Sequence, residues 1–339
     1  MFKSVLKVIF TVFLILVLII GCFVFYMFIG EKKPRQDVKF GVTFSQIFAE
    51  KMGLDWKKAY LEILDELDIK RLRLVAYWPK VEPEKQEFSF EDLDWQIQKA
   101  EERNIDVILA VGKRLPRWPE CHIPDWVKDE SEQKQKEYLL EAIEKTVKRY
   151  RSSSAVKAWQ VENEPFLRGF GHCDDLDKEF LEKEIALVRS LNKKNRPIIL
   201  TASGELSLWS EVAVYADVLG TSLYHQIWNE EVGYFSYPIP PIFYHKRAKL
   251  VKWITGIDKI IIIEAQAEPW GSELLYSGDL PLKKQLELMN REKFKENVEY
   301  IRKTGYDTAY FWGAEWWYWL DRKKDKSGVW EEAKLLFNK

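Results

Sequence analysis

The chain has 339 residues, of which 52 are Lys or Arg and 53 are Asp or Glu, so its net charge is −1. Without a basic excess, no nucleic-acid partner is indicated. The chain also has no acidic block of the kind that is typical of a disordered tail. The length suits one large α/β barrel or two average domains. Aromatic residues are plentiful, with 15 Trp, 15 Tyr and 19 Phe. Core packing accounts for most of them, but flat aromatic faces also suit the faces of sugar rings.

The first part of the chain predicts a membrane segment. Val8 to Ile29 carries no charge, and at about 1.5 Å per residue such a helix spans the hydrocarbon core of a bilayer. We expect an uncleaved anchor with a short linker over residues 1–36 and a single catalytic domain over 37–339. A cleaved signal peptide is the first alternative, although the apolar run is long for one. A lipoprotein site at Cys22 is the second, although apolar residues follow it.

The remainder of the chain alternates short apolar runs with amphipathic helical patterns. Several runs are dense in Val, Ile and Leu without alternation, which is typical of parallel strands buried on both faces. This order predicts an α/β fold, a closed (β/α)8 barrel of the TIM type. A doubly wound open sheet is the alternative, but no Gly-rich phosphate loop follows the first strand. The predicted strands are 39–45, 71–77, 106–112, 156–161, 197–202, 218–224, 259–265 and 308–312.

Two glutamates stand where predicted strands end. Glu164 follows the fourth strand, and Glu264 ends an Ile-rich seventh strand. In TIM barrels the carboxyl ends of the strands carry the chemistry, so the two side chains can meet across the barrel mouth. Such a pair suits glycoside hydrolysis, in which one carboxylic acid protonates the leaving oxygen and one carboxylate attacks the anomeric carbon. This reaction needs no cofactor.

These motifs resemble those of the retaining clan A glycoside hydrolases, the clan of the cellulase and β-mannanase barrels, and in particular family 5. Asn163-Glu164-Pro165 is similar to the acid/base motif of that clan, and Glu264 to its nucleophile. The resemblance implies further roles around this pair. It implies an arginine that keeps the nucleophile ionised, an asparagine on the sugar 2-hydroxyl, a tyrosine on the nucleophile and a tryptophan under the −1 sugar: Arg73, Asn163, Tyr224 and Trp312.

Some details point to other members of the clan or leave roles open. The segment from Arg73 to Asp94 also resembles β-galactosidase-like and xylanase-like members. On the sixth strand, Tyr224-His225 replaces the His-x-Tyr order of cellulase-like members, so the role of His225 is open. Glu268 is the rival nucleophile, in a loop where it could instead bind substrate or a cation. Glu162 shares a strand face with Glu164 and is interpreted as a structural acid.

Two cysteines fall in loops that the barrel brings to its active face. Cys121 and Cys173 follow the third and fourth strands, and a disulfide is expected if the domain is exported. Free thiols are the second interpretation. The adjacent His122 and His172 suggest zinc as a third, but the spacing of metal ligands is absent, and we predict no metal site.

The sequence therefore predicts a membrane-tethered retaining β-glycosidase whose partners are an oligo- or polysaccharide substrate and a membrane. The catalytic domain is placed outside the cytoplasm because polymeric glycans usually lie there. A barrel that binds glycans but has lost turnover is the alternative function. Which sugar is accepted depends on loop side chains that vary freely within a fold.

Overall fold

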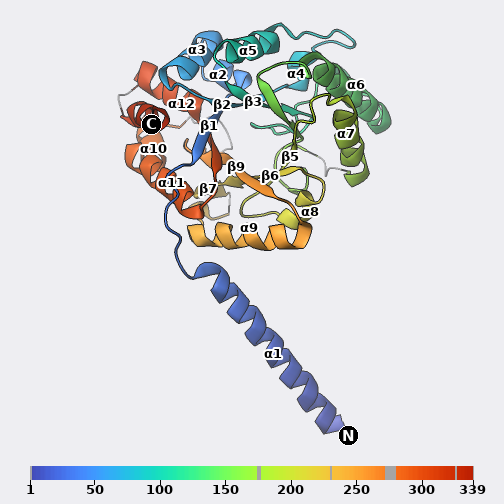
Figure 1. The fold of residues 1–339 in the computed structure, drawn as a ribbon, viewed down its shortest axis with the longest axis vertical. Helices are drawn as coiled ribbons and strands as arrows, with labels where there is room; N and C mark the ends of the chain where they lie inside the picture. The colour runs from blue at the N-terminus through green and yellow to red at the C-terminus, as the bar shows by residue number, and fades with distance from the viewer. Residues whose placement is uncertain (1, 174–176, 230, 272–279, 325–326, 339) are drawn as a thin grey trace.

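The computed structural model describes residues 2–173, 177–229, 231–271, 280–324 and 327–338. Within them, parallel strands close into a barrel in the order β1-β10-β9-β6-β5-β4-β3-β2, with helices around it (Figure 1). The predicted (β/α)8 barrel is confirmed, and the open doubly wound sheet is excluded. The barrel strands are β1 (Lys39–Thr43), β2 (Arg71–Val75), β3 (Asp106–Val111), β4 (Val156–Val161), β5 (Ile198–Ala202), β6 (Val218–Leu223), β9 (Lys259–Gln266) and β10 (Thr308–Trp312).

Helices connect the strands and cover the outside of the barrel. An antiparallel hairpin, which the sequence did not predict, follows β6: β7 (Gln226–Asn229) and β8 (Gly233–Ser236). The α-helices after the first are α2 (Gln46–Lys51), α3 (Trp56–Glu66), α4 (Trp78–Val81), α5 (Glu91–Glu102), α6 (Glu132–Tyr150), α7 (Lys178–Leu191), α8 (Trp209–Ala213), α9 (Pro241–Thr255), α10 (Leu282–Leu288), α11 (Arg291–Thr304), α12 (Ala314–Trp319) and α13 (Val329–Phe337). Among the described residues, the short helical segments are η1 (Asp125–Val127) and η3 (Leu320–Lys324).

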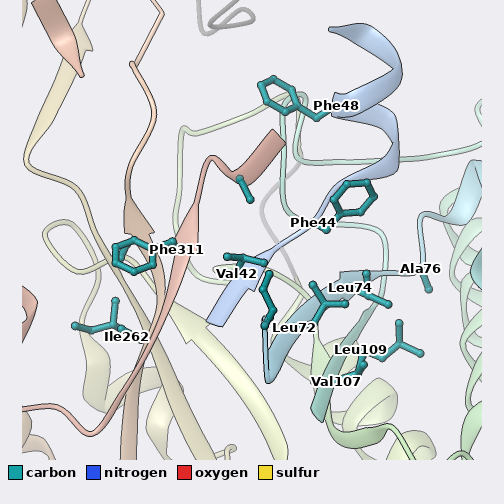
Figure 2. Packing of buried hydrophobic residues seen from close by; sticks show 14 of the residues in the cluster. Val42, Phe44, Phe48, Leu72, Leu74, Ala76, Val107, Leu109, Ile262 and Phe311 are labelled. Carbon is teal, nitrogen blue, oxygen red and sulfur yellow. The ribbon is translucent and has the colours of Figure 1, made fainter. Parts of the chain in front are cut away.

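Successive residues of several strands pack into two separate cores. On β3, Val107 and Leu109 join the large cluster between strands and helices, while Ile108 faces the barrel interior. This follows from the period of two along a strand, and the unbroken apolar run from Val107 to Val111 matches burial on both faces. Figure 2 shows part of the large cluster, where β1, β2 and β3 lie side by side. The interior cluster is Ile108, Ala158, Ile199, Val218, Ile261, Ile263 and Tyr310.

The helix α1 (Phe2–Phe28) stands apart from this body and leaves its rim next to α9 (Figure 1). Its side chains are exposed, apart from the buried Met27 near its end. Among the described residues it is the one helix long and apolar enough to cross a membrane, a test that a signal sequence also passes. The predicted apolar helix is therefore present, and membrane anchoring stays a proposal.

Candidate active site

A cavity of about 560 Å³ opens where the barrel strands end, within the range of about 300–1,000 Å³ that is usual for small-molecule sites. Five of the six predicted site residues line it: Asn163, Glu164, Tyr224, Glu264 and Trp312. The sixth, Arg73, is fully buried and reaches the others from behind the cavity wall. The barrel thus brings together side chains from five of its strands or from the residues that follow them.

Glu264 faces the cavity because of an irregularity in β9. Ile261 and Ile263 both point into the barrel, so strict alternation would turn Glu264 outward toward the helices. However, Thr221 and Ser222 of β6 pair with Ile262 and Glu264, so one residue of β9 is skipped. The register of β9 against β10 shifts over the same stretch. Such a bulge re-aims a side chain, and here it brings the carboxylate to the cavity.

Two donors hold the two oxygens of the Glu264 carboxylate. Arg73 Nη1 donates to Oε1 over 2.6 Å, and the Tyr224 hydroxyl donates to Oε2 over 3.0 Å. Charge-assisted hydrogen bonds of this kind fix the orientation of a carboxylate. Both contacts agree with those that the resemblance implied.

The guanidinium of Arg73 organises more than this carboxylate. Its Nε donates to Gln160 Oε1 and its Nη2 to Asn163 Oδ1, each over 2.8 Å. The amide oxygen of Asn163 also accepts from Gln160 Nε2 and from the Thr201 hydroxyl, at 3.2 Å each. With the oxygen occupied in this way, Asn163 presents its Nδ2 group to the cavity side, where it donates to Glu120 Oε2 over 3.2 Å.

Glu164 is also a buried glutamate, but its surroundings differ from those of Glu264. Its backbone lies in the left-handed region at φ 45°, as does that of Glu162 at 56°, and the Glu164 N–H donates to Thr201 Oγ1 over 2.6 Å. Burial raises the pKa of Glu164 well above its usual value, and the negative charges of Glu264 and Glu120 add to this. Both effects favour the protonated form of Glu164, which faces the same cavity as the carboxyl group that Arg73 and Tyr224 hold.

Glu120, in the loop after β3, is a site residue that the sequence reasoning missed. Its Oε2 accepts from Asn163 Nδ2 over 3.2 Å, and it lines the same cavity. Burial raises its pKa to about 8, and the charge of Glu264 adds to this. Nothing in the local sequence distinguishes it from a surface glutamate, because its placement depends on the path of the loop.

Glu162 has the structural role that was expected. Its carboxylate accepts the backbone N–H groups of Lys113 over 2.8 Å and Arg114 over 2.6 Å, and so holds the loop after β3. Gly112 has a φ of +133°, and an added Cβ there would collide with this carboxylate. The glycine therefore serves both the sharp exit from β3 and the close approach of Glu162.

The rival nucleophile, Glu268, is engaged by a cation. Arg117 donates to Glu268 and, over 3.0 Å, to Glu315 Oε2. The Arg117 guanidinium also lies 4.1 Å from the ring centre of Trp312. One face of Trp312 is thus covered by Arg117, and Glu268 is held in an ion pair, which is the cation-binding role that the sequence left open for it.

Loop aromatics divide into cavity and packing residues. Trp118, Trp228 and Trp270 line the cavity, and the ring of Trp270 stands perpendicular to that of Tyr224 with centroids 5.1 Å apart. Trp126 packs against Trp78 and Tyr138 instead. The tryptophans of α12 are buried in the core: Trp316, Trp317 and Trp319.

Cys121 and Cys173 form a disulfide, with their Cα atoms 5.4 Å apart, which joins the loops after β3 and β4. Their sulfurs are therefore not metal ligands. In the part of the chain that the structure describes, no group of three His, Cys, Asp or Glu side chains could hold a metal ion.

His225 lies away from the cavity chemistry. Its ring packs edge-on against Tyr300, with centroids 4.1 Å apart, and burial lowers its pKa to about 4. Its backbone N–H donates to Gln266 Oε1 over 2.9 Å. The departure from the His-x-Tyr order thus produces a neutral packing residue.

Comparison with known proteins identifies the family. A glycoside hydrolase family 42 model, described as beta-galactosidase, matches residues 54–236, which is more than half of the chain. The chain belongs to glycoside hydrolase family 42. As a member of this family it is a glycosidase, and the predicted clan A glycoside hydrolase is confirmed. The matching model is that of family 42 and not of family 5, and it agrees with one of the two resemblances, β-galactosidase-like and xylanase-like, that the Arg73 to Asp94 segment showed.

A curated β-galactosidase matches part of this family 42 chain. Beta-galactosidase BgaA of Clostridium cellulovorans is 27% identical over 180 residues, 46% of this chain and 26% of the relative. The match thus spans about a quarter of the relative's length.

Solved structures share the fold. They include a β-galactosidase from Halorubrum lacusprofundi (TM-score 0.62, 13% identity, 89% of this chain and 58% of that one) and xylanase 10B from Thermotoga maritima (0.57, 14%, 89% and 95%). A GH5_18 protein from Bifidobacterium longum subsp. infantis is also similar (0.59, 11%, 89% and 78%).

Proposed function

We propose that the chain hydrolyses a β-linked glycoside with retention of configuration, with Glu264 as nucleophile and Glu164 as acid/base. In the first step a Glu264 oxygen bonds to the anomeric carbon while the bond to the leaving oxygen breaks, and Glu164 gives its proton to that oxygen. In the second step water attacks the anomeric carbon, Glu164 accepts a proton of the water, and Glu264 departs as a carboxylate.

The observation that carries this proposal is the unequal environment of two glutamates in one cavity. Arg73 and Tyr224 occupy both oxygens of Glu264 with donors, whereas burial and nearby negative charge raise the pKa of Glu164. Pairs of carboxyl groups whose environments push their protonation apart supply an acid and a base at the same pH. Asn163 Nδ2, which gives one hydrogen to Glu120, is proposed to donate its second hydrogen to the sugar 2-hydroxyl, and Trp312 to border the −1 sugar.

The family description makes a terminal β-galactoside the first substrate to test. The cavity-lining aromatics Trp118, Trp228 and Trp270 would contact the sugar or the aglycone. We further propose that α1 anchors the enzyme in a membrane, with the barrel outside the cytoplasm, where a disulfide such as Cys121–Cys173 persists.

Proton NMR of the first product formed tests the mechanism. A panel of aryl β-glycosides, beginning with the galactoside, should give the β-anomer first, with the α-anomer appearing only as the sugar mutarotates. Glu264→Gln should abolish product formation, whereas Glu268→Gln, which removes a charge from the rival position, should still release the β-anomer.

First appearance of the α-anomer would refute retention. Loss of the β-anomer in Glu268→Gln with normal release by Glu264→Gln would move the nucleophile to the rival position. Saturable binding across a broad glycan panel without any product would favour the alternative of a glycan-binding barrel.

A further inference from the structure

The helix α9 lies on the side of the barrel from which α1 emerges (Figure 1). Residues at spacings of three and four share a helix face, and on α9 these are Phe243, Lys246, Leu250 and Trp253. The first half of this face contacts α1. The ring of Phe243 lies against Phe28 with centroids 5.1 Å apart.

Lys246 closes the end of the apolar helix. Its ammonium group donates to the carbonyl of Tyr26 and, over 2.7 Å, to that of Ile29. It also lies 3.9 Å from the ring centre of Tyr26. The final carbonyls of α1, which have no partner within the helix, therefore receive a charged donor from α9 at the point where α1 ends.

The second half of the same face is uncovered. Trp253 is 82% exposed and the adjacent Ile254 is 56% exposed, and Lys249 and Lys252 beside them are also exposed. An indole and an aliphatic side chain flanked by lysines match the composition of a bilayer interface, where aromatic rings lie among headgroups and lysines reach the phosphates.

We infer that α9 lies on the surface of the bilayer that α1 enters, with Trp253 and Ile254 among the lipid headgroups and Lys249 and Lys252 at the phosphates. This inference rests on the proposed anchor. The helix α9 belongs to the ring of helices around the barrel (Figure 1). The contact would therefore hold the barrel by its side, with the cavity at the strand ends opening along the membrane surface.

Depth-dependent fluorescence quenching tests this contact in the full chain, reconstituted in vesicles of phosphatidylcholine and phosphatidylglycerol. In a Cys22→Ser background, an environment-sensitive fluorophore is attached to Ile254→Cys on α9 or, as a matched control, to Lys145→Cys, an exposed position on α6. A nitroxide lipid labelled near the headgroup is the quencher. The disulfide-bonded cysteines do not react with the label.

The label at position 254 should be quenched several-fold more than the label at 145, and its emission should shift to the blue when vesicles replace detergent. Equal quenching at the two positions would overturn the contact. The wild-type chain labelled at Cys22 separates this from the anchor, because a nitroxide deep in the acyl chains should quench that label. Strong quenching at Cys22 with none at position 254 would refute the contact of α9 with the bilayer but keep the anchor. No quenching at Cys22 would refute the anchor and, with it, the α9 contact.

Discussion

Tyr224→Phe removes a single oxygen atom from the proposed site and keeps the ring. The lost hydroxyl donates to Glu264 Oε2 over 3.0 Å. During glycosylation Glu264 gives up its charge to the sugar, so this hydrogen bond weakens as the reaction proceeds. During deglycosylation the carboxylate regains its charge, so the same hydrogen bond strengthens in the transition state. The variant should therefore be slow mainly in the second step.

The size of the effect follows from the type of hydrogen bond. A hydrogen bond to a charged group contributes about 1.5–3 kcal/mol. Since about 1.36 kcal/mol corresponds to tenfold in rate, deglycosylation should slow by about 10- to 150-fold. The covalent intermediate then accumulates, so kcat and KM should fall together, while kcat/KM, which reports glycosylation, changes much less.

Stopped-flow kinetics with a dinitrophenyl β-glycoside of the accepted sugar measures this directly. The variant should show a burst of dinitrophenolate close to one equivalent per active site, and intact-protein mass should rise by one glycosyl unit at steady state. Tyr60→Phe is the matched control. Tyr60 is a buried tyrosine outside the cavity, and its hydroxyl donates a hydrogen bond to the Gln96 carbonyl over 2.8 Å. That control should show wild-type kinetics.

Two outcomes would refute this reasoning. Unchanged kcat without a burst would mean that Tyr224 does not support the departing carboxylate. A kcat/KM that falls as far as kcat at constant KM would place the effect in glycosylation instead.

Three further perturbations follow from the site. Glu164→Ala should lose about 10²- to 10⁴-fold in kcat/KM for poor leaving groups but little in kcat/KM for dinitrophenyl glycosides; with the latter kcat should still fall because the second step lacks its base, and azide should restore it as a β-glycosyl azide; equal losses in kcat/KM on both substrates would contradict acid catalysis. The pKa of Glu120 is raised to about 8, so its contribution to stability is lost as pH rises from the unfolded value through 8. Glu120→Gln should therefore melt higher than wild type at pH 8, by roughly 1–2 °C for each kcal/mol relieved, and match it at pH 5; a constant offset would argue against titration. Cys121→Ser with Cys173→Ser should lower stability by about 2–4 kcal/mol, measured as a lower denaturation midpoint, and dithiothreitol should affect wild type but not this variant.

The barrel could be predicted because each of its strands is marked by a local sequence pattern. Runs such as Ile260 to Ile263 are apolar without alternation, and the structure buries one set of side chains against helices and the other inside the barrel. The glutamates were predicted from their positions at strand ends, together with a motif. The hairpin β7–β8 was missed, since its residues lack the apolar alternation of a half-buried strand.

The parts that could not be predicted depend on geometry with no local signal. Strict alternation along β9 would have turned Glu264 outward, and only the register of its neighbours β6 and β10 reveals the bulge. The positions of Glu120 and Arg117 depend on the course of the loop after β3, which the disulfide and Glu162 hold. That Arg117 covers one face of Trp312 could not be inferred from spacing, because the two residues are far apart in the sequence, one in the loop after β3 and the other at the end of β10.

Trapping the intermediate tests the central claim most directly. Incubation with a 2-deoxy-2-fluoro-β-glycoside that carries dinitrophenolate as its leaving group, followed by intact-mass and peptide analysis, locates the covalent bond. We predict one fluoroglycosyl unit per chain, attached to the peptide containing Glu264 through its carboxylate. Modification at Glu268 or Glu164, or turnover of the reagent by Glu264→Gln, would contradict the assignment.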